Sequence, residues 1–347
     1  MSYLTFKPHP LLCGFIAFMV WFLPISTCTN NVFAQSSSSS DERERGIVLF
    51  RQREHSRAIA ELKKAVKADK NDFEGWHFLG LAQIQIDDLK HAAESFQKAL
   101  TLRPDFAPAH VGFGYVALLQ NKWPEAIREA RLALDLDPNI PEAHYVIGAA
   151  SIRTGNREEA VKHAEAAVRL APTYSAAYLL KSQALVDVSA NPLTSDQWKI
   201  TEIRSACYLE AAAALEKYLQ LEPNTPQKEI WLGQIASLRF YSISHGEGTG
   251  SERVYSSKDV TTKARVISKP EPDFPEAGRA AGGGRVVLRC IFAADGTVTH
   301  LLILEGQPHG ITEAALDSAR RIKFVPAKLN DQPVSIYMQV EYDFRTY

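Results

Sequence analysis

The chain has 347 residues, and its 39 lysine and arginine residues nearly balance its 40 aspartate and glutamate residues. This balance excludes nucleic acid as the main partner, because phosphate binding needs a clustered excess of basic side chains. The hydrophobic content of 46% excludes a chain that is disordered throughout. The length predicts two or three domains.

Residues 1–34 are predicted to direct export. Leu11–Ile25 is almost entirely apolar, and the small residues Val32 and Ala34 precede a possible signal-peptide cleavage site. The apolar run is 15 residues long, whereas a transmembrane helix needs roughly 20. Two alternatives stay open, namely a retained membrane anchor and lipid attachment at Cys28. All three interpretations export the chain.

Residues 35–40 are expected to be a flexible serine-rich spacer. From there to residue 242, small residues recur every 34 positions. The recurring residues are Gly46, Gly80, Gly114 and Gly148, then Ala65, Ala99, Ala133 and Ala167, with Pro104, Pro138 and Pro172 closing successive units. This period and residue pattern resemble those of the tetratricopeptide repeat, a pair of helices that stacks on its neighbours.

The repeat pattern divides the region 41–242 into helical units. We expect repeats at about 41–72, 73–106, 107–140 and 141–174, an interrupted repeat at 175–225 and a capping helix at 227–242. The interruption adds 17 residues between Val188 and Ala206, which are expected to form a protruding loop of unassigned role. A terminal helix is needed because each repeat buries its apolar side only on its neighbour.

The resemblance to tetratricopeptide repeats implies a binding surface. In that family the first helix of each repeat lines a concave groove that suits an extended peptide or a partner helix. Carried onto this chain, the groove residues would be His77, Leu81, Val111, Tyr115 and Tyr145. The alternative is that Leu81, Val111 and Tyr115 belong to the packing between helices.

Residues 243–264 are expected to be a flexible linker, after which the apolar period changes to two. The predicted elements are strands Val286–Phe292 and Val298–Leu304 joined at Asp295-Gly296, a helix Ile311–Lys323, and a long strand Val334–Phe344. This order predicts a small α+β domain over 265–347, in which the helix covers one face of a three-stranded sheet.

The sequence from Arg265 to Tyr347 resembles the TonB C-terminal domain. The opening Pro272–Glu276, with its Phe-Pro pair, and the segment Phe324–Ala327 are the most specific matches. The fold class is therefore multidomain, with an all-α solenoid of tetratricopeptide repeats followed by a ββαβ domain of the TonB C-terminal type.

The TonB resemblance implies a periplasmic domain that captures an extended segment of an outer-membrane transporter by β-strand addition. The partner would pair with the edge of the last strand, at Ser335, Tyr337, Gln339, Glu341 and Asp343. The alternative is that these residues are only the solvent-facing side of an amphipathic strand.

The expected function is that of an exported, TonB-type cell-envelope protein that binds protein partners and is linked to transmembrane transport. We expect it in the periplasm, with any inner-membrane anchor or lipid confined to the N-terminal segment. In TonB-type transducers the membrane span contains a serine and a histidine, and Leu11–Ile25 contains neither. The alternative is therefore a periplasmic scaffold with no energy-transducing role. The sequence contains no catalytic motif or metal-ligand cluster, so neither enzyme activity nor a cofactor is expected.

Overall fold

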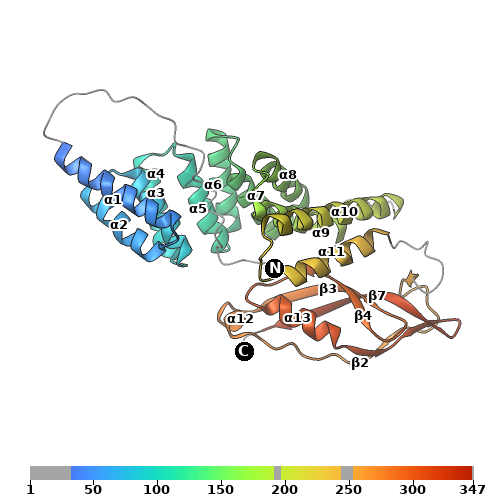
Figure 1. The fold of residues 1–347 in the computed structure, drawn as a ribbon. Helices are drawn as coiled ribbons and strands as arrows, with labels where there is room; N and C mark the ends of the chain where they lie inside the picture. The colour runs from blue at the N-terminus through green and yellow to red at the C-terminus, as the bar shows by residue number, and fades with distance from the viewer. Residues whose placement is uncertain (1–32, 191–196, 244–252, 346–347) are drawn as a thin grey trace. The chain divides into compact units, whose positions relative to one another are not determined.

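The computed structural model describes residues 33–190, 197–243 and 253–345 (Figure 1). These residues fall into two compact units, the first ending at Ala177 and the second beginning at Tyr178. Residues 1–32 of the predicted export segment, including Cys28, lie outside the described residues. No helix in the described ranges is long and apolar enough to cross a membrane.

The first unit is a stack of helix pairs (Figure 1). Its helices are α1 (Phe33–Arg51), α2 (His55–Ala68), α3 (Phe73–Gln85), α4 (Leu89–Leu102), α5 (Ala107–Leu119), α6 (Trp123–Leu136), α7 (Pro141–Thr154) and α8 (Arg157–Leu170). The two helices of each pair pack together, and the second helix of one pair contacts the first helix of the next. The first helices α3, α5 and α7 also contact one another in turn. This is the predicted repeat architecture.

The recurring small residues lie where these helices approach most closely. Ala92 and Ala99 of α4 are fully buried, as are their counterparts Ala126 and Ala133 of α6. A side chain on Gly80 would come within 2.9 Å of the Phe96 ring. The 34-residue period is therefore a consequence of helix packing, since larger residues at these positions would separate the helices.

Helix α1 corrects the predicted spacer at residues 35–40. The helix begins at Phe33 and contains Ser36–Ser40, and Ser39 is buried. The segment Asp41–Arg51 forms the C-terminal part of this helix. Because neither glycine nor proline occurs among the serines, the helix can continue through them toward its N-terminus.

The second unit begins within α9 (Ser175–Ala190) and continues through α10 (Gln197–Leu221) and α11 (Lys228–Ile243). The expected loop between Val188 and Ala206 is wrong for residues 197–205, which form the start of α10. Those residues contain no glycine or proline, so a helix that forms over Cys207–Leu221 can propagate backward through them. The Arg204 side chain donates to the Ser189 carbonyl at 2.9 Å and joins α10 to the end of α9.

The C-terminal part of the second unit is built around a mixed sheet. Its elements are β1 (Val254–Tyr255), β2 (Arg265–Ser268), α12 (Glu276–Ala280), β3 (Gly284–Phe292), β4 (Val298–Glu305), α13 (Ile311–Arg320), β5 (Lys323–Val325), β6 (Ala327–Leu329) and β7 (Gln332–Phe344). The strand order is β1-β7-β3-β4, with β6 also paired to β7, and β2 and β5 form a separate two-stranded sheet. Strand β3 pairs antiparallel with both β4 and β7, and β1 pairs parallel with β7.

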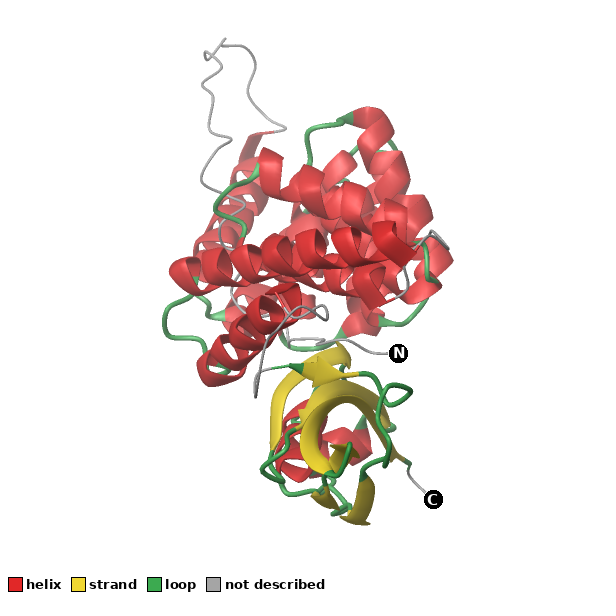
Figure 2. Ribbon diagram, turned by 90° about the vertical axis from the view of Figure 1, so that its right-hand side faces the viewer, coloured by secondary structure: helices red, strands yellow, loops and turns green. Residues whose placement is uncertain are grey.

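The core of the sheet lies against α13. Figure 2 shows the long strands, in yellow, curving past a helix packed inside the curve. Ile311, Ala315 and Ala319 of α13 are fully buried against residues such as Leu288 of β3 and Val340 of β7. The predicted ββαβ arrangement is thus present. The predicted linker 243–264 is wrong at Val254–Tyr255, where Val254 is buried and the two residues form β1.

Candidate protein-interaction surfaces

Strand β7 is paired along only part of one side. Strand β3 pairs with β7 from Ile336 to Phe344. On the opposite side, β1 pairs with Ser335 and Ile336 only. Among the described residues no strand pairs with that side beyond Ile336, so Tyr337–Phe344 forms a free edge.

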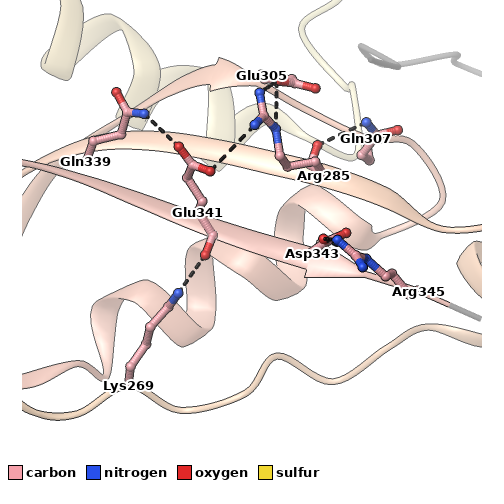
Figure 3. Close-up of polar contacts among 8 residues, drawn as sticks. All are labelled: Lys269, Arg285, Glu305, Gln307, Gln339, Glu341, Asp343 and Arg345. Atoms are coloured by element: carbon pink, nitrogen blue, oxygen red, sulfur yellow. Dashed lines mark hydrogen bonds and ion pairs between the residues drawn. The ribbon is translucent and has the colours of Figure 1, made fainter.

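One side chain already contacts this free edge. The Lys269 ammonium, which follows β2, donates to the Glu341 carbonyl at 2.6 Å (Figure 3). It approaches β7 from the side opposite Arg285 of β3 (Figure 3). Because backbone groups in an antiparallel strand point alternately to its two sides, those of Gln339, Glu341 and Asp343 share this outward direction. A lysine at an exposed edge also disfavours unwanted pairing with other chains.

The side chains above the free edge form a polar network (Figure 3). The Gln339 amide donates to the Glu341 carboxylate at 2.9 Å, and Arg285 forms an ion pair with the same carboxylate at 3.6 Å. Arg285 also donates to Glu305 at 3.0 Å, and these carboxylates raise the pKa of the guanidinium. The network surrounds the exposed backbone with polar groups and leaves its outward amides accessible.

The five predicted edge residues therefore lie in three different environments. Ser335 lies outside the free edge because β1 pairs with it, and its hydroxyl accepts from the Ala294 amide at 3.1 Å. Tyr337 is half-buried, with its ring centroid 6.1 Å from that of Tyr241. Gln339, Glu341 and Asp343 are exposed. The prediction of a partner-binding edge now rests on these last three.

The other edge of the sheet, on β4, is covered by α11. The Gln234 side-chain amide donates to the Leu301 carbonyl at 2.9 Å and accepts from the Ile303 amide at 2.8 Å. It thus binds the pair of backbone groups that a neighbouring strand would bind. Tyr241 of α11 donates to the His300 carbonyl at 2.9 Å. Strand addition at this edge would require α11 to leave.

Helices α10 and α11 also contact the face of the sheet opposite α13. The Arg289 guanidinium of β3 donates to the Tyr208 hydroxyl of α10. The Phe240 ring of α11 stacks on His300 of β4, with centroids 3.7 Å apart, and burial lowers the pKa of this histidine. The sequence analysis did not predict these contacts, although apolar residues on both faces of Val298–Leu304 are typical of a strand that is covered on both sides.

The five residues predicted for the repeat groove separate into two groups. His77, Leu81 and Val111 are buried in the packing between helices. Tyr115 of α5 and Tyr145 of α7 are half-buried, and the Tyr145 ring lies 5.6 Å from that of Tyr174. Binding at this face stays a prediction, and the accessible part of the predicted set is the two tyrosines.

Family models match both parts of the chain. A model described as the Gram-negative bacterial TonB protein C-terminal matches residues 270–346, and a tetratricopeptide-repeat model matches residues 43–107 and 111–175. The chain carries tetratricopeptide repeats and a TonB C-terminal domain. Both are families of protein-interaction domains, so the two surfaces described above belong to modules that bind proteins.

Individual proteins are also similar to parts of this chain. Superkiller complex protein 3 is 30% identical over 88 residues in Homo sapiens and 31% identical over 88 residues in Mus musculus. Each alignment covers 25% of this chain, and the chain spans only 6% of those relatives. Among solved structures, MamA is 21% identical, with 56% of this chain and 95% of that chain covered and a TM-score of 0.40. A tetratricopeptide-repeat protein of Thermus thermophilus is 15% identical, with 58% and 98% covered and a TM-score of 0.45.

The repeats contain a histidine that should make their stability depend on pH. Burial lowers the pKa of His77 to about 3, and its Nδ1 atom has no hydrogen-bond partner among the described residues. The unfolded chain therefore binds a proton below its ordinary pKa of about 6.5 while the folded chain does not, so stability is lost as the pH falls. From pH 7 to pH 5 the loss from this residue is about 2 kcal/mol.

Urea denaturation followed by helical circular dichroism at the two pH values measures this loss. In the variant His77→Phe the loss between pH 7 and pH 5 should be smaller by about 2 kcal/mol. Phenylalanine suits the site because the His77 ring already contacts Phe96 and Phe106. The hydrogen bond with Glu129 raises the pKa of His110, so this residue stabilises the folded chain as the pH falls. That contribution is the same in parent and variant and cancels in the comparison. An equal pH dependence in parent and variant would refute the assignment.

Proposed function

We propose that this is an exported cell-envelope protein whose TonB C-terminal domain binds an extended segment of a protein partner by β-strand addition. The partner segment pairs with the free edge of β7, and a segment of a TonB-dependent outer-membrane transporter is the partner class that the domain family suggests. The protein works in the periplasm, held at the inner membrane if its N-terminal segment is retained.

The observation that supports this proposal most directly is the difference between the two sheet edges. The β4 edge is occupied by Gln234 and Tyr241 of α11. On the free edge of β7, by contrast, the described residues show one side-chain hydrogen bond to the outward backbone, from Lys269 to the Glu341 carbonyl, and the same ammonium lies 4.5 Å from the centroid of the Tyr342 ring. A lysine can move aside at little cost because water solvates its ammonium group, whereas a helix cannot. A partner strand would then bind the outward backbone groups of Gln339, Glu341 and Asp343.

A scaffold role without energy transduction is the second candidate. The sequence favours it in one respect, because the apolar run Leu11–Ile25 lacks the serine and histidine of transducer spans. The repeats supply a second surface at Tyr115 and Tyr145, by which a scaffold could hold another partner. In this case the repeats would retain envelope partners whether or not the free edge of β7 is occupied.

Proline at position 339 tests strand addition. The variant Gln339→Pro removes one outward amide of the free edge and leaves the ladder to β3 intact. Binding of a synthetic peptide from the N-terminal segment of a TonB-dependent transporter should weaken about tenfold or more, since one backbone hydrogen bond is lost and its neighbours are distorted. Fluorescence anisotropy with the full chain measures the affinity.

The matched control is Gln339→Ala, which changes the side chain and keeps the amide. Its affinity should stay within about twofold of the parent, because strand addition uses the backbone. Parental affinity in Gln339→Pro would exclude the free edge of β7 as the binding site. Loss of affinity in both variants would instead indicate recognition of the glutamine side chain.

A further inference from the structure

We propose that the repeats bind a basic side chain, arginine or lysine, of an extended partner segment at Tyr115, Tyr145, Tyr174 and Glu142. These four residues are called the tyrosine–glutamate cluster. The proposal rests on the suggestion that the first helices of the repeats form a binding surface, and it names the chemistry of the partner there. It is independent of strand addition at β7.

The cluster is assembled from three parts of the first unit. Tyr115 lies on α5, Tyr145 and Glu142 lie on α7, and Tyr174 lies in the segment that follows α8. The Tyr145 and Tyr174 rings are inclined by 49° with centroids 5.6 Å apart. All four residues are partly accessible. The cluster is therefore a surface feature that a partner side chain can reach.

In the part of the chain that the structure describes, the polar groups of the cluster lack side-chain partners. Among the described residues, the hydroxyls of the three tyrosines have no hydrogen-bond partner, and the Glu142 carboxylate accepts only from its own backbone amide. Burial raises the pKa of Glu142 to about 7 and raises the pKa of all three tyrosines. None of these polar atoms is among the fully buried unpaired atoms of the described residues, so water or a ligand can reach them. Four polar groups without a side-chain partner at one accessible place leave their hydrogen-bonding capacity to a ligand.

The chemistry of these groups selects a cation. The faces of tyrosine rings attract a positive charge, and a partly desolvated carboxylate gains most from a cationic partner. A guanidinium has five N–H donors and no acceptor, so it can serve the carboxylate and the hydroxyl oxygens together. An acidic side chain would be repelled by Glu142, and an apolar one would leave the four groups unpaired.

One basic side chain close to the cluster, that of Arg153, is engaged by an aromatic ring. Arg153 of α7 lies close enough to lower the pKa of Tyr145. Its guanidinium is held over the Trp123 ring, 5.6 Å from the centroid. Within the described ranges no ion pair joins Glu142 to a basic side chain, so the complementary positive charge is assigned to a partner.

Peptide pools test the proposal with the full-length protein. The probes are acetylated, amidated nonapeptides of serine, alanine and leucine whose central residue is arginine, lysine, citrulline or glutamate. Citrulline has the shape of arginine without its charge. The parent protein should retain the arginine and lysine pools at least fivefold better than the citrulline and glutamate pools.

The variant Glu142→Gln should abolish this preference, and Glu158→Gln should preserve it. Glu158 occupies the corresponding first turn of α8 but is exposed. Equal retention of all pools by the parent, or an undiminished preference in Glu142→Gln, would overturn the proposal. The variant Gln339→Pro distinguishes this proposal from strand addition at β7. The preference for basic peptides should survive in Gln339→Pro. If the preference were lost in Gln339→Pro and kept in Glu142→Gln, the basic peptides would bind at β7 and not at the tyrosine–glutamate cluster.

Discussion

Gly283→Ala is expected to destabilise the TonB C-terminal domain by about 3 kcal/mol or more. Gly283 has a φ of +73°, and a Cβ at this position would overlap the backbone oxygen of Phe344 at the end of β7. Rotation of a side chain cannot relieve the overlap, since the obstructing atom belongs to the backbone. The start of β3 would have to move away from β7.

Alkylation of Cys290 is a suitable measurement for this variant. The Cys290 side chain is fully buried in the core of the sheet, and burial raises the pKa of its thiol to about 12. Mass spectrometry should therefore find it protected in the parent and alkylated rapidly in Gly283→Ala. The control is Gly282→Ala, where φ is +88° but nothing lies within 4 Å of a Cβ. It should cost only the ~1–2 kcal/mol of a left-handed residue. Equal protection of Cys290 in the two variants would show that the close approach of Gly283 to the Phe344 backbone does not determine the stability of the domain.

Phe96→Ala is expected to reduce the free energy of unfolding of the repeats by about 3–5 kcal/mol. The Phe96 ring is fully buried. It fills the space left by two glycines on the flanking first helices, Gly80 of α3 and Gly112 of α5, since a Cβ at either position would overlap or crowd the ring. Its removal leaves a cavity between three helices that cannot close, because their spacing is set by the alanines that separate them.

Urea denaturation followed by helical circular dichroism measures the effect of Phe96→Ala. The control is Leu132→Ala on α6, whose side chain is 41% exposed and which should cost no more than about 0.5–1 kcal/mol. Similar losses in the two variants would contradict the role of Phe96 as the residue that joins successive repeats.

The repeats and the sheet could be predicted from the sequence because local packing rules fix their residues. Helices that approach at Ala92 and Ala99 need small residues at a constant interval, and a strand with one buried face alternates in polarity. The turn at Asp295-Gly296 marks the hairpin because glycine accepts the positive φ of +86° found there.

The features that sequence reasoning missed depend on contacts between distant residues or on very short segments. Gln234 binds backbone groups 67 residues away, and a glutamine on a helix looks like a surface residue in sequence. Strand β1 is two residues long and has no periodicity to detect, which is why Ser335 was assigned to the free edge. Glu142 was overlooked because an acidic residue is ordinary in the first turn of a helix, where it favours the helix dipole.

The contact between Gln234 and β4 has a consequence for dissecting this protein into fragments. A fragment cut between α11 and β1, where the sequence suggests a linker, would contain the whole sheet but lose the helix that occupies the β4 edge. Its Leu301 carbonyl and Ile303 amide would then be bare, and an unpaired strand edge readily pairs with other chains or with a second copy. Partners captured by such a fragment could be bound to a surface that the intact protein keeps covered. A fragment that begins at Lys228 retains α11. A partner that binds the fragment without α11 but not this longer fragment would therefore be an artefact of exposing the β4 edge.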